Sequence, residues 1–159
     1  MINNQRQQFP KTVMDIMDKD ERVVVLLGDI GVFAFKDVFE KYPKRIYNIG
    51  ICEQTMVGMA AGLAMAGFIP VIHTISPFLV ARAYEQIRDD FGFQNLVGTF
   101  VGVNVYDTSP NLGLTHSCPE DLDLMNHVNG MQTFAPETAE QFDKLLKENY
   151  EKLNYFRIQ

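Results

Sequence analysis

The feature that most constrains this chain is a repeated alternation between short apolar runs and segments with helical spacing. The run RVVVLLGD at 22–29 is rich in valine and leucine and closes at a glycine, which is typical of a strand covered on both faces. The other predicted strands are 45–50, 69–75, 96–104, 131–135 and 154–158, and the predicted helices are 11–18, 35–41, 53–66, 79–91, 120–127 and 137–150. Strands that alternate with helices in this way form a mainly parallel sheet. We therefore predict a single doubly wound α/β domain over residues 1–159, with helices on both faces.

Composition narrows the class of protein. Hydrophobic residues make up 47% of the chain and charged residues 21%, values that are ordinary for a globular domain. A formal net charge of -6 argues against a nucleic-acid surface, which needs clustered Lys and Arg. Neither a signal peptide nor a membrane span is predicted, because the start lacks an apolar run and the apolar stretch 54–72 is interrupted by glycines and a proline. With Cys52 and Cys118 as the only cysteines, we expect a cytoplasmic protein without nucleic-acid or membrane partners.

Glu53 is the single charged residue in NIGICEQTMVGMAAGLAMAG, residues 48–67. One interpretation is an acid in the first turn of a helix, where the helix dipole favours a negative charge by about 0.3–1 kcal/mol. The helix that follows is rich in Gly and Ala and apolar on every side, so a carboxylate at its start lies at the edge of a buried site. Loss of water favours the neutral, proton-donating form of such an acid. The second interpretation is therefore a general acid that faces a ligand.

Three motifs in order give the chain a family resemblance. They are NIGICEQTMVGMAAGLAMAGFIPV at 48–71, RAYEQIRDD at 82–90 and GLTHSCPEDLDLM at 113–125. Together they resemble the pyrimidine-binding domain of thiamine-diphosphate enzymes of the transketolase and deoxyxylulose-phosphate synthase type. The likeness extends from about residue 11 to the end of the chain.

The resemblance implies a role for two residues at the cofactor's aminopyrimidine ring. Glu53 matches the glutamate that hydrogen-bonds ring nitrogen N1′ and exchanges a proton with it, which starts the chemistry of thiamine diphosphate. Phe78 matches the aromatic residue that stacks on the ring, although Pro77 departs from the usual Ser-Thr-Phe pattern. From the residues alone, Phe78 also fits a core position.

Further site residues follow from the same likeness. Asp29 and Ile51 are expected to line the cofactor site, and Arg82 to face the site or a subunit interface. His116 is expected to reach the substrate's oxygens, since a polar loop at strand ends suits a working histidine. Asp29 equally fits a turn residue after a strand.

No metal site is expected in this chain. Cys118, His116 and His127 do not have the spacing of a standard zinc site. His73 lies in an apolar strand and His127 near a helix end, and both are interpreted as structural.

Two departures from the family pattern limit the functional prediction. Val105 and Leu112 stand where the synthase carries a basic and an acidic residue, which argues against a phosphorylated sugar acceptor. The chain also lacks the GDG…N motif that holds the diphosphate and its Mg²⁺ in the family. Diphosphate-binding and C-terminal domains are therefore expected on another chain or on a removed segment, and this chain is expected to be inactive alone.

The resulting prediction is a transketolase-like transferase that moves two-carbon ketol units between sugars. It is expected to work with a complementary diphosphate-binding subunit, as a homodimer or a heterotetramer. Two alternatives stay open: the pyrimidine subunit of a 2-oxoacid-cleaving enzyme, and a noncatalytic assembly module that retains the fold. Nicotinamide binding is disfavoured, since no G-x-G-x-x-G follows the first strand.

Overall fold

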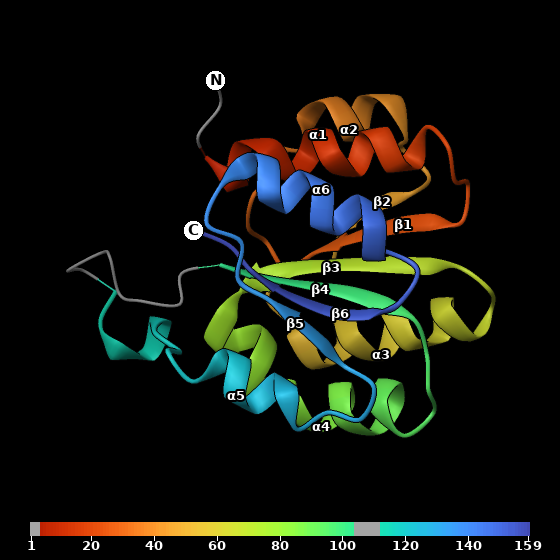
Figure 1. The fold of residues 1–159 in the computed structure, drawn as a ribbon. Coiled ribbons are helices and arrows are strands. Elements are labelled where there is room, and N and C mark those ends of the chain that lie inside the picture. The colour runs from red at the N-terminus through yellow and green to blue at the C-terminus, as the bar shows by residue number, and fades with distance from the viewer. Residues whose placement is uncertain (1–3, 104–111) are drawn as a thin grey trace.

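The computed structural model describes residues 4–103 and 112–159 as a three-layer arrangement, with a sheet between two layers of helices (Figure 1). The sheet has six strands in the order β2-β1-β3-β4-β6-β5. Every pair of neighbouring strands is parallel. The strands are β1 Val23–Leu27, β2 Ile46–Asn48, β3 Ile69–Ile75, β4 Gly98–Val103, β5 Gln132–Phe134 and β6 Leu153–Arg157. The predicted doubly wound α/β fold is confirmed.

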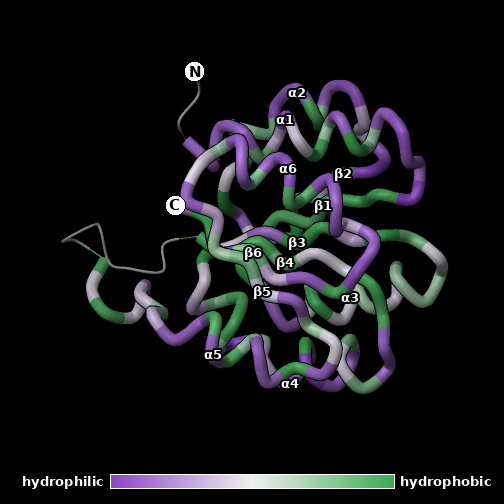
Figure 2. Tube along the Cα trace, in the orientation of Figure 1, coloured by the Kyte–Doolittle hydropathy of each residue, from purple (hydrophilic) through white to green (hydrophobic). Residues whose placement is uncertain are grey.

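The helices divide between the two faces of the sheet (Figure 1). One face carries α1 Gln5–Met17, α2 Lys36–Lys41 and α6 Ala139–Asn149. The other carries α3 Glu53–Met65, α4 Tyr84–Gln86 and α5 Asp121–Asn126. Two separate apolar cores result, one on each side, because successive side chains of a strand point to opposite faces. The central strands are accordingly the most continuously hydrophobic segments (Figure 2).

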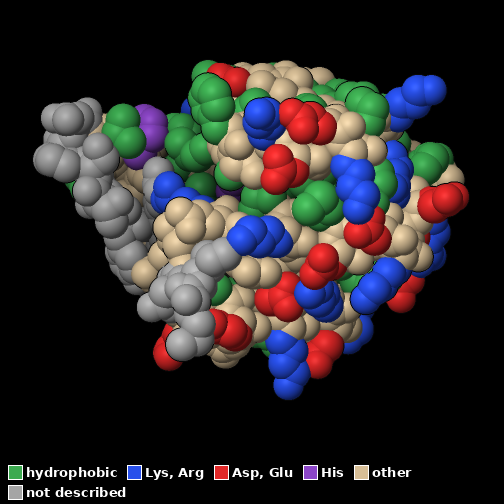
Figure 3. Space-filling model, turned by 90° about the horizontal axis from the view of Figure 1, so that it is seen from above, with side chains coloured by type: hydrophobic (Ala, Val, Ile, Leu, Met, Phe, Trp, Pro, Cys, Tyr) green, Lys and Arg blue, Asp and Glu red, His purple; other side chains and the backbone are tan. Residues whose placement is uncertain are grey.

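The outer surfaces of the two helical layers differ. Over α1, α2 and α6, Lys and Arg side chains are interspersed with Asp and Glu (Figure 3). On the other face, α3 has the sequence EQTMVGMAAGLAM, and its one charged residue, Glu53, is buried. Among the described residues, no helix is long and apolar enough to cross a membrane.

The first helix begins earlier than predicted. It starts at Gln5 rather than at residue 11, and Pro10 therefore lies inside it instead of in its first turn. The side chain of Asn4 caps the helix by accepting a hydrogen bond of 2.9 Å from the backbone N–H of Arg6. Pro10 removes one backbone hydrogen bond, and tertiary packing of the buried Phe9 and Val13 compensates.

The predicted helix 79–91 is broken into wider turns. The structure has two π-helical segments, η1 Pro77–Ala81 and η2 Ile87–Gly92, on either side of α4. The backbone N–H of Arg82 donates to the carbonyl of Pro77 at 3.2 Å, a five-residue step rather than the four-residue step of an α-helix. Such π turns occur often at functional sites, and this one carries Phe78.

Candidate functional site

A cavity opens where β1 and β3 end and α3 begins. Its volume is about 180 Å³, and it is lined by Gly28, Asp29, Ile30, Ile51, Glu53, Thr74, Ile75, Phe78 and His116. Carboxyl ends of parallel strands are the usual ligand-binding edge of doubly wound sheets. The structure thus brings together five residues that were predicted from separate parts of the sequence: Asp29, Ile51, Glu53, Phe78 and His116.

Glu53 is the first residue of α3, and only 1% of its surface is exposed. Nη1 of Arg82 donates a hydrogen bond of 2.8 Å to its Oε2. The Arg82 side chain is 43% exposed, so the pair lies at the edge of the cavity and not deep in the core. Burial of Glu53 agrees with the sequence prediction. The pairing of this carboxylate with Arg82 was not predicted, because Arg82 was expected only to face the site or a subunit interface.

Arg82 also covers Phe78. The guanidinium carbon lies 4.2 Å from the centroid of the Phe78 ring, within the range of a cation–π contact. The ring of His116 approaches Phe78 edge-on, with centroids 4.9 Å apart and planes at 79°. Arg82 therefore faces the site, and it holds the carboxylate of Glu53 beside the aromatic ring.

Asp29 lies at the exposed rim, on a turn whose geometry depends on a residue that the sequence prediction missed. Asn48, at the end of β2, accepts hydrogen bonds at Oδ1 from the backbone N–H groups of Asp29 at 3.0 Å and Gly50 at 3.2 Å. Its amide nitrogen donates to Oδ1 of Asp29 at 2.9 Å. The strained φ of 57° at Asp29 is thus supported by a neighbouring strand. The sequence offered one signal for this role: Asn48 is a polar residue between Ile46 and Ile49 in the predicted strand 45–50.

Thr74 is a second residue that was missed. Its hydroxyl donates to the carbonyl of Gly28 at 3.3 Å, and a Cβ built at Gly28 would lie 2.9 Å from the Thr74 side chain. A glycine is therefore required at the end of β1, because any side chain would displace β3. The signal was the period of two in β3, which places Thr74 on the face opposite to His73.

The other residues considered in the sequence analysis lie at the margin of the site or outside it. His127 is exposed, with Nδ1 bonded to the carbonyl of Asp123 at 2.6 Å. Burial, and then the nearby carboxylates, raise the pKa of Cys118 to about 12, so this thiol is unreactive at neutral pH. Within the described residues, no three His, Cys, Asp or Glu side chains gather as a metal site. Leu112 is exposed, whereas Val105 lies outside the described residues.

The chemistry of the site follows from these contacts. The buried carboxylate of Glu53 lines a cavity together with the aromatic ring of Phe78, three isoleucines and three further polar side chains. Such a cavity suits a flat heteroaromatic ring that carries a basic nitrogen, since the carboxylate can exchange a proton with that nitrogen. The residues present therefore fit an aminopyrimidine.

Residues 4–157 match the family described as "Transketolase, pyrimidine binding domain". The chain belongs to this family. The predicted resemblance to transketolase and deoxyxylulose-phosphate synthase is confirmed.

Relatives of the pyrimidine-binding domain include both separate subunits and longer chains. The chain is 33% identical over 124 residues to one subunit of the apulose-4-phosphate transketolase of Actinobacillus succinogenes, a match that covers 78% of this chain and 40% of that protein. It is 34% identical over 142 residues to 1-deoxy-D-xylulose-5-phosphate synthase of Clostridium tetani, a match that covers 87% of this chain and 22% of the synthase. The chain thus spans less than half the length of these relatives.

A solved structure titled as a split gene transketolase, an inactive beta4 tetramer, has the same fold. It superposes with a TM-score of 0.84 and 29% identity over 98% of this chain and 51% of that one. Membership of the pyrimidine-binding family accounts for the fold and for the kind of cofactor, thiamine diphosphate. The roles of individual residues remain predictions.

Proposed function

We propose that this chain is the pyrimidine-binding component of a thiamine-diphosphate-dependent, transketolase-like enzyme that transfers two-carbon ketol units between sugars. The observation that carries this proposal is the buried carboxylate of Glu53, which shares with the ring of Phe78 the cavity at the carboxyl ends of β1 and β3. Burial of a charge is costly unless it is paired, and the partner of Glu53, Arg82, bonds only one of its two oxygens among the described residues, at the wall of a cavity.

The residues of this chain have distinct tasks in that proposal. Thiamine diphosphate, when bound, supplies the carbon nucleophile and electron sink needed to break a bond beside a carbonyl. Glu53 holds the proton that it shares with N1′ of the aminopyrimidine, and Phe78 offers a flat face to that ring. Arg82 donates a hydrogen bond to Oε2 of the same carboxylate. Asp29 and Ile51 line the same cavity and are proposed to contact the aminopyrimidine.

His116 has a separate task at the edge of the cavity. It lies on a short turn, η3 Leu114–His116, and its ring contacts Phe78 from the side. The side chain is only part-buried, and Nδ1 lies 3.1 Å from the hydroxyl of Thr115. We propose that His116 donates a hydrogen bond to an oxygen of the sugar.

The surroundings of the cavity support a partner subunit. Three loops that carry cavity residues also present apolar side chains to solvent: Phe33 is 98% exposed, Ile51 72% and Leu114 86%. An apolar rim around a polar site marks an interaction surface. We propose that a diphosphate-binding subunit, which holds Mg²⁺, covers this rim, and that the uncharged outer face of α3 contributes to a dimer or heterotetramer. Both cysteines are unpaired, which fits the cytoplasm.

The test is to assemble the chain with a diphosphate-binding subunit, thiamine diphosphate and Mg²⁺, and to measure transfer between sugars. Glu53→Gln is expected to lower the rate by about 10²- to 10⁴-fold, because general acid–base contributions have that size. Glu40→Gln, an exposed glutamate on α2, serves as the matched control and is expected to have no effect.

Other outcomes identify the alternatives. An unchanged rate for Glu53→Gln would remove this residue from the mechanism. Transfer that requires a 2-oxoacid donor would favour the 2-oxoacid-cleaving alternative. If calorimetry shows an intact complex that binds no thiamine diphosphate, the chain is an assembly module.

A further inference from the structure

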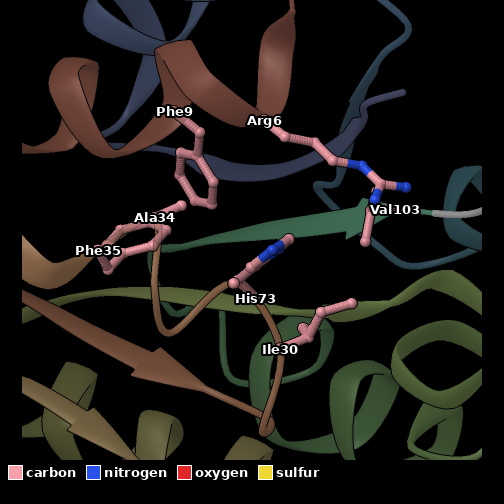
Figure 4. A pocket seen from close by; sticks show the side chains of 8 residues that line it. Arg6, Phe9, Ile30, Ala34, Phe35, His73 and Val103 are labelled. Carbon is pink, nitrogen blue, oxygen red and sulfur yellow. The ribbon is translucent and has the colours of Figure 1, made fainter.

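The same edge of the sheet carries a second cavity, on the opposite face. It has a volume of about 130 Å³ and lies between α1, the turn after β1, and the ends of β3 and β4 (Figure 4). Ile30 lines both this cavity and the one that contains Glu53. The turn after β1 therefore separates the two spaces, and the proposed function does not use the second one.

His73 places a hydrogen-bond acceptor in this cavity. Its side chain is buried, and Nδ1 lies 2.9 Å from the carbonyl oxygen of Val101. Because a carbonyl oxygen can only accept, Nδ1 carries the proton and Nε2 keeps its lone pair. Burial lowers the pKa of His73 to about 4, so the ring is neutral at physiological pH. In the part of the chain that the structure describes, no hydrogen bond to Nε2 is found, and the ring projects into the cavity (Figure 4).

Aromatic rings form the wall beside that acceptor. The ring of Phe9 meets those of Phe35 and His73 edge-on, both at centroid distances of 5.1 Å. Phe9 and Phe35 are each only 1% exposed, so close packing on their other sides holds the two rings in place. A Cβ at Gly31 would lie 3.3 Å from Nε2 of His73, so the glycine keeps the space beside the acceptor open. The cavity therefore offers fixed aromatic faces around an unprotonated ring nitrogen.

The volume limits a ligand to one small ring. An apolar cavity of about 150 Å³ binds benzene, a single six-membered ring. The second cavity is slightly smaller, at about 130 Å³, but Ala34, which lines it, is exposed, so the cavity opens to solvent there. One six-membered ring with a small substituent fits this space, whereas bicyclic ligands and nucleotides are too large.

We propose that this cavity binds a neutral phenol of one ring, which lies against Phe9 and Phe35 and donates a hydrogen bond from its hydroxyl to Nε2 of His73. The acceptor requires a donor on the ligand, and the aromatic walls favour a flat apolar ring, which extends their edge-to-face packing. A phenol carries its donor directly on the ring, so it meets both requirements within the available volume. Because the ligand is neutral, binding does not depend on the charge of Arg6, whose guanidinium lies next to Val103 in another part of the wall (Figure 4). The site is independent of the cofactor site and of its proposed chemistry.

The test uses the 159-residue chain with phenol as the probe, followed by NMR of the His73 imidazole nitrogens. Phenol is expected to shift the Nε2 resonance as the new hydrogen bond forms, and the shift should saturate with a Kd on the order of 1 mM. The Nδ1 resonance should move much less, because its bond to Val101 is kept.

Fluorobenzene tests the hydrogen bond itself. It has the same ring and nearly the same size as phenol, but it has no O–H donor. In a titration followed by the backbone amide signals of Gly31 and Ala34, fluorobenzene is expected to bind about fivefold more weakly than phenol, the worth of one ordinary hydrogen bond.

Two alanine variants test the place of binding. Ala34→Leu and Ala66→Leu enlarge an exposed alanine by the same amount, but only Ala34 lines the cavity, whereas Ala66 follows the end of α3. Ala34→Leu is expected to weaken phenol binding by at least about fivefold, because the larger side chain takes up part of the space, and Ala66→Leu to leave it unchanged. Both positions are exposed, so neither variant threatens the fold.

Three results would overturn the proposal. The first is no saturable shift of the His73 resonances with phenol up to about 10 mM, tenfold above the expected Kd. The second is equal binding of fluorobenzene, which would show that Nε2 accepts no hydrogen bond from the ligand. The third is equal binding of phenol by Ala34→Leu and Ala66→Leu, which would place the ligand elsewhere on the protein.

Discussion

Glu53 and Asp121 are both acids at the first position of a helix, both are almost completely buried, and both pair with an arginine. Their surroundings differ. Asp121 accepts hydrogen bonds from the Nε of Arg157 at 2.9 Å and from its terminal nitrogen, and also from the hydroxyl of Tyr155. The Arg157 side chain is 14% exposed. Among the described residues, the only hydrogen bond to the carboxylate of Glu53 comes from Arg82, which is 43% exposed.

The difference lies in how many carboxylate oxygens are hydrogen-bonded to other side chains. Both oxygens of Asp121 are bonded to side chains of β6, and the hydroxyl of Tyr155 lies 3.2 Å from that of Ser76. This network fixes α5 against the sheet, and with it the loop that carries His116. Burial and then Asp121 raise the pKa of Tyr155 well above its usual range, so its hydroxyl keeps the donating proton. Glu53 has one bonded oxygen and a partly exposed partner, and its second oxygen remains available to a ligand.

The largest effect is expected from Asp121→Ala. Removal of one partner of a buried, hydrogen-bonded pair leaves Arg157 and Tyr155 without their acceptor, and should lower the free energy of unfolding by about 3–5 kcal/mol. Urea denaturation followed by circular dichroism measures this change. Asp123→Ala on the exposed side of α5 is the control and should stay within about 0.5 kcal/mol of wild type. Equal losses for the two variants would show that the network contributes nothing specific.

An intermediate effect is expected from Arg82→Ala. This variant leaves the buried carboxylate of Glu53 without its hydrogen-bond donor. Because water can enter the space that the Arg82 side chain occupied, the free energy of unfolding should fall by only about 1–2 kcal/mol. Arg88→Ala is the matched control on the next segment, because Arg88 pairs with Asp89 and both side chains are half exposed. Its cost should be below about 0.5 kcal/mol in the same denaturation experiment. If Arg82→Ala lowers the free energy of unfolding as much as Asp121→Ala does, the Glu53–Arg82 and Asp121–Arg157 pairs contribute equally to stability.

The sequence predicted much of the architecture, but little of the difference between the hydrogen-bond partners of Glu53 and Asp121. The strand 69–75 and the helix that starts at Glu53 follow from buried apolar runs and from a Gly–Ala-rich helix, which are local patterns. The pairing of Glu53 with Arg82 joins residues 29 positions apart and depends on how η1 turns back toward α3. The hydrogen bonds between Asn48 and Asp29 likewise join the ends of two strands, 19 positions apart in the sequence.

The smallest effect on stability is expected from Glu53→Gln. This substitution tests the difference between Glu53 and Asp121 most directly. The amide oxygen of Gln can still accept from Arg82, and loss of a buried charge removes a desolvation penalty, so the unfolding free energy should change by less than about 1 kcal/mol. Asp121→Asn is the matched variant. It should lower the free energy of unfolding by more, because Arg157 and Tyr155 donate to different oxygens of Asp121 and Asn has only one side-chain oxygen. Urea denaturation of the two variants side by side distinguishes them. If Glu53→Gln barely alters stability but lowers the transfer rate of the assembled enzyme as proposed, Glu53 serves function and not stability, as expected where active sites are not optimised for stability. Equal destabilisation by both variants would instead place Glu53 with Asp121 among the structural acids.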